Sequence, residues 1–411
     1  METTAINVIG MGYIGLPTAL MLAAHGNQVV GTDYKPEVVN RLRNGEVTFE
    51  EAGLKELYQK AVAGGMRFSD EYQKAEVYII AVPTPYDKKS KKVDAGYVIR
   101  AVVSVLEVCD KGAVLVIEST VSPGTIDRYI RPQIESMGYQ EGTDIHLVHA
   151  PERIIPGNML YELVHNSRTI GADDIEIAKK IQKIYQTFCQ GEIVLTDIKS
   201  AEMTKVIENT YRDINIAFAN ELAKICHLAG MNVYEIIRIA NKHPRVNILS
   251  PGPGVGGHCI SVDPWFLVGD YPELAHLIHE ARLINDSMPE YVLNRIYEIM
   301  EKNGIKDIQK IGMYGLTYKE DVDDVRESPT LQLLDCMKRH LGSGIRVYDP
   351  YVKNAVGEEQ FQNLEEFLNA VDMVVIMVGH KEIREHQELL ADKVVYDTRH
   401  IGEEETSYEM L

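Results

Sequence analysis

The chain has 411 residues, of which 45% are hydrophobic and 25% are charged. This composition is typical of a soluble globular protein with two or three domains. The formal net charge of −19 would repel a phosphate backbone, which argues against a nucleic-acid-binding or anionic-membrane-binding protein. The five cysteines include no C-x-x-C pair, so the sequence predicts a reduced, cytoplasmic protein.

Residues 5–24 carry no charge and have the length of a membrane span. Glycines and a proline interrupt this run, no basic residue precedes it, and a strand-like segment follows at once. We therefore expect neither a membrane segment nor a targeting signal.

The first motif is a glycine-rich turn between a strand and a helix. The apolar run 5–9 is followed by GMGYIG and by a segment of helical composition, and the next strand ends at Asp33. This order matches the dinucleotide-binding fingerprint, in which the helix N-terminus faces the pyrophosphate. An acid at position 33 would bind ribose hydroxyls and repel a 2′-phosphate, which favours NAD over NADP. The alternative is a purely structural turn. The predicted cofactor contacts in the turn are Gly10, Gly12, Tyr13, Ile14 and Gly15.

Further buried strands are predicted at 77–82, 113–118 and 145–150, with helical patterns between them. Such alternation predicts a parallel sheet covered on both faces, with ligands at the carboxyl ends of its strands. Thr84, Thr120 and Glu152 follow these strand ends and are candidate cofactor or substrate contacts. Each of them taken alone could be an ordinary loop residue.

The middle of the chain is predicted to be helical. The longest helix spans about 199–227 with Gly230 as its stop, and others are expected at 232–241 and 272–302. Lys205 and Asn209 are four residues apart and so share one helical face, and taken alone they would be an ordinary surface pair. We expect this region to link two domains and to form a dimer contact.

The strand rhythm resumes at 308–316, 344–349, 371–378 and 393–397. The turn after the first of these strands lacks the glycine pattern and offers Lys319 and Arg326 instead, so a degenerate nucleotide-binding domain is predicted. The acidic end of the chain is expected to be frayed. The predicted fold is therefore α/β, with two Rossmann-like, doubly wound parallel-sheet domains joined by a central helical dimerisation region. The predicted boundaries are 1–198, 199–302 and 303–411.

Residues 251–266, PGPGVGGHCISVDPWF, are too rich in glycine and proline for a helix or strand and are expected to present Cys259 from a loop. A thiolate is useful when an aldehyde must be oxidised further, because its addition gives a thiohemiacetal that becomes a hydrolysable thioester. Lys205 and Asn209 could stabilise an oxyanion, and Asp263 could act as a base.

Other uses of these residues remain open. His258, Cys259 and Asp263 are metal-ligand types, but their spacing is poor for zinc and no metal site is expected. A two-electron dehydrogenase of the hydroxyacid type would also have a dinucleotide-binding domain over the first 200 residues and a helical middle. A non-catalytic NAD-binding protein could also keep the fold.

The sequence resembles the UDP-glucose/GDP-mannose dehydrogenase family over nearly its whole length. The resemblance rests on motifs in a fixed order, namely GMGYIGLP, AVPTP, ESTVSPGT, PERIIPGN, AEMTKVIENTYRDINIAFANE, GVGGHCISVDP and GLTYKEDVDDVRESP. It implies a four-electron oxidation of a sugar C6 alcohol to a carboxylate, with NAD as cofactor and a thioester on Cys259. It also implies an N-terminal NAD domain, a helical dimer core, a C-terminal UDP domain and a UDP-sugar as the partner molecule.

The same resemblance assigns roles by motif position. Catalytic roles fall on Cys259, Lys205, Asn209 and Asp263, together with Glu152 and Thr120, which would also position substrate and water. Arg326 would lie beside the cofactor, and the implied substrate contacts are Glu152, Arg153, Lys205, Asn209, Arg245, Gly256 and Lys319, with Arg245 reaching a neighbouring subunit's sugar.

One departure concerns the sugar. Members that oxidise UDP-glucose usually carry a second glutamate where this chain has Pro156. The form PERIIPGN and the residues around the cysteine are most similar to members that act on UDP-N-acetyl-D-mannosamine. UDP-N-acetylglucosamine and UDP-glucose are the alternatives.

Overall fold

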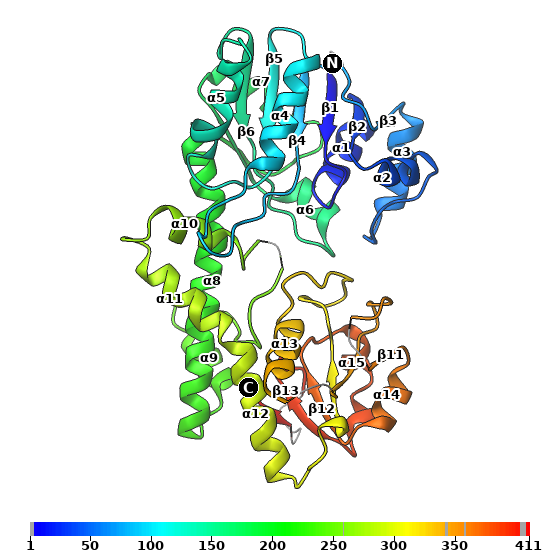
Figure 1. Ribbon diagram of the computed structural model, residues 1–411, viewed down its shortest axis with the longest axis vertical. Coiled ribbons are helices and arrows are strands. Elements are labelled where there is room, and N and C mark those ends of the chain that lie inside the picture. Colours follow the sequence, from blue (N-terminus) through cyan, green and yellow to red (C-terminus); the bar gives the residue numbers. More distant parts are fainter. Residues whose placement is uncertain (1–3, 258, 342–343, 357–358, 403–407) are drawn as a thin grey trace. The chain divides into compact units, whose positions relative to one another are not determined.

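The computed structural model describes residues 4–257, 259–341, 344–356, 359–402 and 408–411. The chain divides into two compact units, Met1–Glu208 and Asn209–Leu411. The division falls inside the longest helix, α8 (Ile198–Ala229), which is the central green helix of Figure 1. The predicted division into three domains at 198 and 302 stays a prediction.

The first unit is built on an eight-stranded sheet in the order β3-β2-β1-β4-β5-β6-β7-β8. Its first six strands follow the classic order of a dinucleotide-binding fold. The pairing is parallel except between β6 and β7, which run antiparallel. The strands are β1 (Ala5–Ile9), β2 (Gln28–Thr32), β3 (Arg67–Ser69), β4 (Val77–Ile80), β5 (Ala113–Ile117), β6 (Ile145–His149), β7 (Arg168–Ala172) and β8 (Ile193–Thr196).

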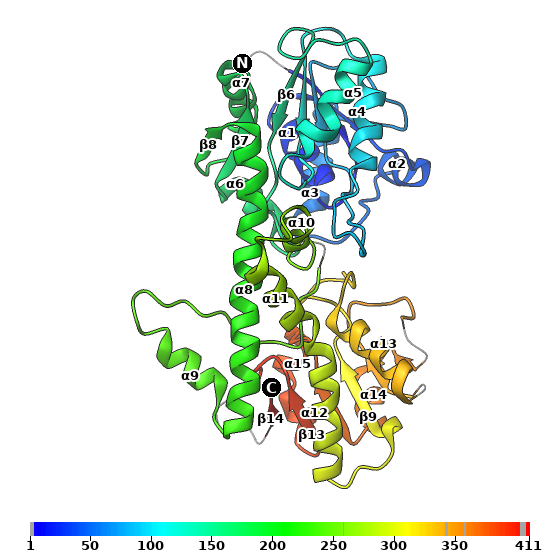
Figure 2. The same cartoon turned by 60° about the vertical axis from the view of Figure 1, so that its left-hand side comes forward.

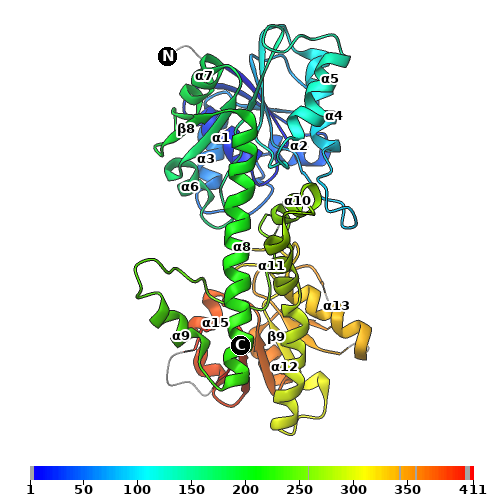
Figure 3. The ribbon, with the colours of Figure 1, turned by 90° about the vertical axis from the view of Figure 1, so that its left-hand side faces the viewer.

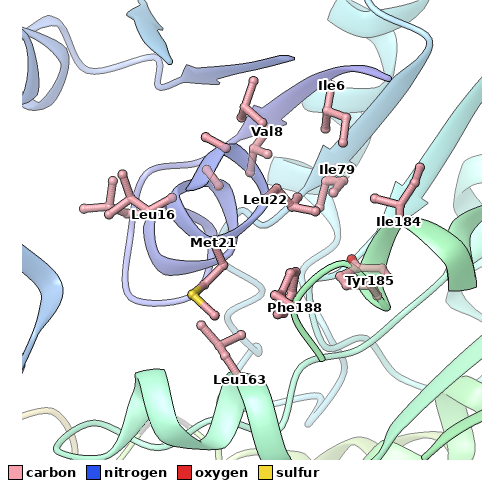
Figure 4. Packing of buried hydrophobic residues seen from close by; sticks show 14 of the residues in the cluster. Ile6, Val8, Leu16, Met21, Leu22, Ile79, Leu163, Ile184, Tyr185 and Phe188 are labelled. Atoms are coloured by element: carbon pink, nitrogen blue, oxygen red, sulfur yellow. The ribbon is translucent and has the colours of Figure 1, made fainter. Parts of the chain in front are cut away.

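Helices cover both faces of this sheet, as its continuous apolar strands require. The helices are α1 (Gly15–Ala24), α2 (Pro36–Arg43), α3 (Leu54–Ala63), α4 (Gly96–Val108), the π-helix η1 (Ile126–Ile130), α5 (Arg131–Ser136), α6 (Met159–His165) and α7 (Ile175–Tyr185). Figure 4 shows the core on one face, where Leu22 of α1 lies beside Val8 of β1 and Ile79 of β4, and Met21 points towards Leu163 of α6. This burial holds the glycine turn, which precedes α1, against the sheet.

The second unit contains a six-stranded, wholly parallel sheet in the order β11-β10-β9-β12-β13-β14. Numbered within this unit, that order repeats the 3-2-1-4-5-6 pattern of the first sheet. The strands are β9 (Ile311–Tyr314), β10 (Arg346–Tyr348), β11 (Gln360–Phe361), β12 (Met373–Ile376), β13 (Val394–Asp397) and β14 (Glu409–Met410). The helical turns around them are η2 (Ile308–Lys310), α13 (Pro329–Leu341), α14 (Leu364–Ala370), α15 (Lys381–Glu385) and η3 (Gln387–Leu390).

The last residues, 408–411, are not frayed as expected, whereas 403–407 of the same acidic tail lie outside the described residues. Glu409 and Met410 pair with β13, and Leu411 is buried. Glu409 also forms an ion pair with Lys302. The acidic composition of the tail gave no sign that the backbone of Glu409 and Met410 completes the sheet or that the side chain of Leu411 enters the core.

The helical region contains α8, α9 (Val233–Ala240), α10 (Asp263–Asp270), α11 (His276–Asp286) and α12 (Met288–Lys302). Gly230 follows α8 at a φ of +67°, as its predicted stop requires. Figure 3 shows the succession of α10, α11 and α12 in yellow-green to yellow.

Two expectations for this region were wrong. The helix expected over 272–302 is divided at Ser287, and Pro289, which lacks an N–H, sits in the first turn of the second piece. The glycine-rich segment is irregular only as far as Val262, because α10 begins at Asp263 with Pro264 in its first turn. No helix in the described ranges combines the length and the apolar character needed to cross a membrane.

Candidate functional site

The glycine turn of the first unit fits a dinucleotide. Gly10 has a φ of +94°, and a Cβ on Gly15 would lie only 1.9 Å from the carbonyl oxygen of Gly10, so both positions demand glycine. Gly12 differs, since a Cβ there would meet no heavy atom within 4 Å. The space beside Gly12 is therefore available to a ligand that approaches the backbone at the start of α1.

Asp33 lies at the end of β2 beside this turn. Its Oδ2 accepts the N–H of Met11 at 2.8 Å, and its Oδ1 accepts the N–H of Lys35 at 3.0 Å. The carboxylate thereby ties the turn to the neighbouring strand. The ring of Tyr13 stacks on Phe49 with centroids 4.4 Å apart, and Ile14 is partly buried against the same core. These residues fit NAD, whose pyrophosphate would lie at the N-terminus of α1 and one of whose riboses would lie at Asp33.

The ends of β4 and β5 are held by hydrogen bonds. The hydroxyl of Ser119 donates to the carbonyl of Val82 at 2.7 Å. The predicted contacts Thr84, which is buried, and Thr120, which is half-buried, follow these two residues in the sequence. The loop after Thr120 is fixed by Glu202 of α8, whose carboxylate accepts the N–H groups of Gly124 and Ile126. Burial raises the pKa of Glu202 to about 7.

Glu152 follows β6 and is buried. One of its oxygens accepts the N–H of Arg153 at 2.7 Å, and the other pairs with the guanidinium of Arg168 on β7. The side chain of Arg153 is itself engaged with Thr169 at 2.8 Å and with Glu208 of α8 at 2.7 Å. Arg153 therefore ties β7 to α8, and its predicted contact with substrate stays a prediction.

Cys259 is exposed, as expected for a presented thiol. Its carbonyl accepts the N–H groups of Val262 at 3.0 Å and Asp263 at 2.8 Å, so the residue sits just before the first turn of α10. The glycines before it pack closely, because a Cβ on Gly256 would lie 2.7 Å from Tyr318. The loop thus has a fixed base and an exposed cysteine. His258 lies outside the described residues.

Asp263 and Asn209, two of the predicted catalytic residues, lie in contact, and their catalytic roles stay a prediction. Both are buried, and the amide of Asn209 donates to Asp263 Oδ2 at 2.6 Å. Asn209 lies on α8 one turn after Lys205, which is also buried. The described residues contain no group of three or more histidine, cysteine, aspartate or glutamate side chains that could hold a metal ion.

The loop is anchored on α8 by a buried polar network. Asn220 Oδ1 accepts the N–H of Gly252 at 2.9 Å, and its amide donates to Asn285 Oδ1 at 2.8 Å. The amide of Asn285 donates to Asp213 Oδ1, which also accepts from Arg282 at 2.6 Å. All four of these side chains are almost fully buried. The network fixes the start of the cysteine loop relative to α8 and α11.

The second sheet repeats the acid-and-turn arrangement of the first. Asp349 Oδ2 accepts the N–H of Leu316, two residues after β9, at 2.6 Å, and its Oδ1 accepts the N–H of Tyr351 at 2.8 Å. This is the pattern that Asp33 makes. His380 adds a contact at 3.1 Å to Asp349 Oδ2. Burial acts to raise the pKa of Asp349, but His380 and the two N–H donors outweigh it and lower the pKa.

The remaining predicted residues are more exposed. Lys319 is half-buried in the segment that packs on the cysteine loop. Arg326 is exposed, and its guanidinium bonds to Asp324 with Nε–Oδ1 at 2.9 Å. Arg245 is exposed in the segment after α9. Their predicted ligands stay predictions.

The sequence analysis did not identify several buried polar side chains that hold the predicted site residues and their loops in place. The sequence analysis placed Glu118 at a strand end and Glu202, Asn220 and Arg282 in helices without a role, and it predicted no element around Arg168. The available signal was a charged or amide side chain at a position where the period of the element predicts burial.

Three family models cover most of the chain, all from the UDP-glucose/GDP-mannose dehydrogenase family. They are its NAD binding domain over residues 4–189, its central domain over 199–287 and its UDP binding domain over 312–404. The chain belongs to the UDP-glucose/GDP-mannose dehydrogenase family. It is an NAD-dependent nucleotide-sugar dehydrogenase, and the predicted family, cofactor and α/β fold with two parallel-sheet domains and a central helical region are confirmed.

Relatives share the full architecture. A UDP-N-acetyl-D-mannosamine dehydrogenase of Methanococcus vannielii is 43% identical over 96% of this chain and 92% of its own. An NDP-N-acetyl-D-galactosaminuronic acid dehydrogenase of Ralstonia nicotianae is 40% identical over 97% of this chain and 96% of its own. The solved UDP-N-acetyl-mannosamine dehydrogenase of Staphylococcus aureus is 40% identical, with a TM-score of 0.87 over 99% of this chain and 97% of that one.

The space beside Gly12 generates a prediction. Gly12→Ala should fold with an unchanged melting temperature, because the new methyl group meets nothing in the protein, but should weaken NAD binding by about tenfold or more because it occupies the cofactor's approach. Isothermal titration with NAD measures this. In the matched variant Gly15→Ala the methyl group meets backbone, so its melting temperature should fall. Wild-type NAD affinity in Gly12→Ala would contradict the assignment.

Proposed function

We propose that the protein oxidises the C6 alcohol of UDP-N-acetyl-D-mannosamine to the carboxylate of UDP-N-acetyl-D-mannosaminuronate, through a thioester on Cys259. The observation that carries the proposal is the exposed cysteine at the base of α10, on a loop whose next helix places Asp263 against Asn209. UDP-N-acetylglucosamine and UDP-glucose are the alternative substrates.

The chemistry balances as two oxidations and a hydrolysis. NAD accepts a hydride in each oxidation, so two molecules are consumed. The alcohol first gives an aldehyde, and the Cys259 thiolate adds to its carbonyl carbon to form a thiohemiacetal. Loss of the second hydride leaves a thioester, which water cleaves to the carboxylate and the thiol.

The buried polar residues suit these steps. Lys205 would stabilise the alkoxide and oxyanion, and Asn209 would donate a second hydrogen bond. Asp263, already held by Asn209, would take up protons. Glu152 and Thr120 would position sugar and water, while Arg245, Gly256 and Lys319 would hold the UDP-sugar.

Because Cys259 must be a reduced thiol, the proposal places the protein in a reducing compartment such as the cytoplasm.

The choice of sugar rests on Pro156 and on the names of the relatives. Pro156 replaces the second glutamate that the resemblance associates with UDP-glucose, and relatives at 43% identity are named for UDP-N-acetyl-D-mannosamine. In the structure, the segment around Pro156 is held instead by Glu51 and Glu162, which accept the N–H groups of Met159 at 2.8 Å and Ile155 at 2.7 Å. A panel of UDP-N-acetylhexosamines and UDP-glucose, followed by NADH formation, distinguishes the candidates.

The stoichiometry provides a direct test of the reaction. The wild-type protein should form two NADH for each uronate, whereas Cys259→Ser should stall before uronate is released, because an ester hydrolyses more slowly than a thioester. NADH absorbance and chromatographic measurement of the uronate give the ratio. Cys336→Ser serves as the control, since Cys336 is a half-buried cysteine on α13. One NADH per product would favour the two-electron alternative.

The proposal includes a homodimer formed through α8. Tyr211, Phe218, Ile225 and Leu228 are exposed apolar side chains, and the first three recur every seven residues on this helix. Figure 2 shows α8 along its length. A seven-residue apolar repeat on a helix is the pattern of a helix–helix contact, and exposed apolar area of this kind is unfavourable in a monomer.

Phe218→Glu should therefore shift the protein towards monomer, because it places a charge in the repeat. Sedimentation velocity measures the shift. Leu274→Glu is the matched control, since Leu274 is 79% exposed but lies outside α8. A monomeric wild-type protein would overturn this part of the proposal.

A further inference from the structure

A second carboxyl group lies behind Glu152 in the first unit. Glu118, at the end of β5, is 1% exposed, and its Oε1 lies 3.8 Å from the guanidinium of Arg168. The same guanidinium pairs with Glu152 and stacks on Tyr185 of α7, 4.5 Å from the ring centroid. Two carboxyl groups thus share one buried arginine.

The hydrogen bonds distinguish the two carboxyl groups. Both oxygens of Glu152 accept hydrogen bonds, one from Arg168 and one from the N–H of Arg153, as expected for an ionised carboxylate. Glu118 Oε1 accepts from the hydroxyl of Tyr185 at 3.0 Å. Its Oε2 is buried and makes no hydrogen bond of ordinary geometry among the described residues, but the hydroxyl of Thr18 on α1, which is equally buried, acts on this carboxyl group and lowers its pKa. An ionised oxygen in this place is costly, whereas a protonated oxygen carries no charge and can donate to the Thr18 hydroxyl.

We propose that Glu118 is a proton-bearing positioning residue, which braces Arg168 as a neutral acid and so leaves the arginine's charge to Glu152. The inference rests on the proposed function, in which Glu152 positions sugar and water. Glu118 touches no reacting atom in this scheme and acts only through Arg168.

The charges around Glu118 support this assignment. Burial, and then the charge of Glu152, raise the pKa of Glu118 to about 8 against the lowering effect of Arg168. The groups that face the pair come from each neighbouring element: Glu152 after β6, Arg168 on β7, Tyr185 on α7, Cys189 after α7 and Thr18 on α1. Arg168 is the one cation in this set, so a second ionised carboxyl group would leave a buried negative charge without compensation.

The proton has a functional consequence. When Glu118 ionises at alkaline pH, it competes with Glu152 for Arg168, and Glu152 loses the partner that orients it. The free energy of unfolding also depends on pH, because the pKa of Glu118 is higher in the folded state than in the unfolded state. The stabilisation is full below the ordinary carboxyl pKa near 4.5 and is lost as the pH rises to about 8.

Glu118→Gln tests the proposal, because glutamine reproduces the shape of a neutral acid but cannot ionise. Infrared difference spectra of the whole protein between pH 6 and pH 10 should show a protonated carboxyl band that titrates near pH 8 and is absent in Glu118→Gln. Glu202 is another buried carboxyl group with a raised pKa, so its titration must be distinguished from that of Glu118. The Glu202→Gln variant should retain the band that is assigned to Glu118. A spectrum of Glu118→Gln identical to wild type would overturn the proposal.

Kinetics provide the second readout. Glu118→Gln should keep near wild-type kcat at pH 7 and lose the decline of kcat above pH 8, while Glu118→Ala should lower kcat at every pH because Arg168 is no longer braced. Glu176→Gln, an exposed change on α7, should keep the wild-type profile. An alkaline decline unchanged in Glu118→Gln would contradict the positioning role. If no UDP-sugar yields NADH, the proposed function fails, but the infrared titration still tests the proton on Glu118.

Discussion

The buried ion pair between Asp213 and Arg282 is the constraint on which the cysteine loop depends. Its two charges are 2.6 Å apart, and both side chains are at most 1% exposed. Removing one partner of such a pair costs about 3–5 kcal/mol, because the other charge stays buried. The pair orients Asn285, Asn285 orients Asn220, and Asn220 holds Gly252 at the start of the loop. A loop rich in glycine is thereby given a fixed origin.

In the first unit, too, buried charged side chains fix irregular segments of the chain. Glu202 fixes the backbone after Thr120, and Arg168 fixes Glu152, each from a buried position. These anchors cost stability, since buried charges are desolvated, and burial accordingly raises the pKa of Glu202 to about 7. The benefit is that side chains on irregular segments acquire fixed positions, which the two successive oxidations that we propose would require.

The relation between sequence and structure differs between elements. Continuous apolar runs predicted the central strands of both sheets, and the glycines at 10 and 15 predicted a turn that admits no other residue. The antiparallel β7 was not predicted because strand direction depends on long-range pairing. The terminal strand escaped because its backbone, rather than its composition, completes the sheet. Glu118 escaped because its burial depends on Arg168, fifty residues away.

In the reaction that we propose, the anchored loop presents Cys259 as the nucleophile. The most direct measurement is mass spectrometry of the wild-type protein, quenched with acid during turnover of UDP-N-acetyl-D-mannosamine and NAD, followed by peptide mapping. The account predicts a uronyl thioester on the peptide that contains Cys259 and on no other cysteine. Steady uronate formation without an adduct on Cys259, together with full turnover by a variant that lacks this thiol, would contradict it.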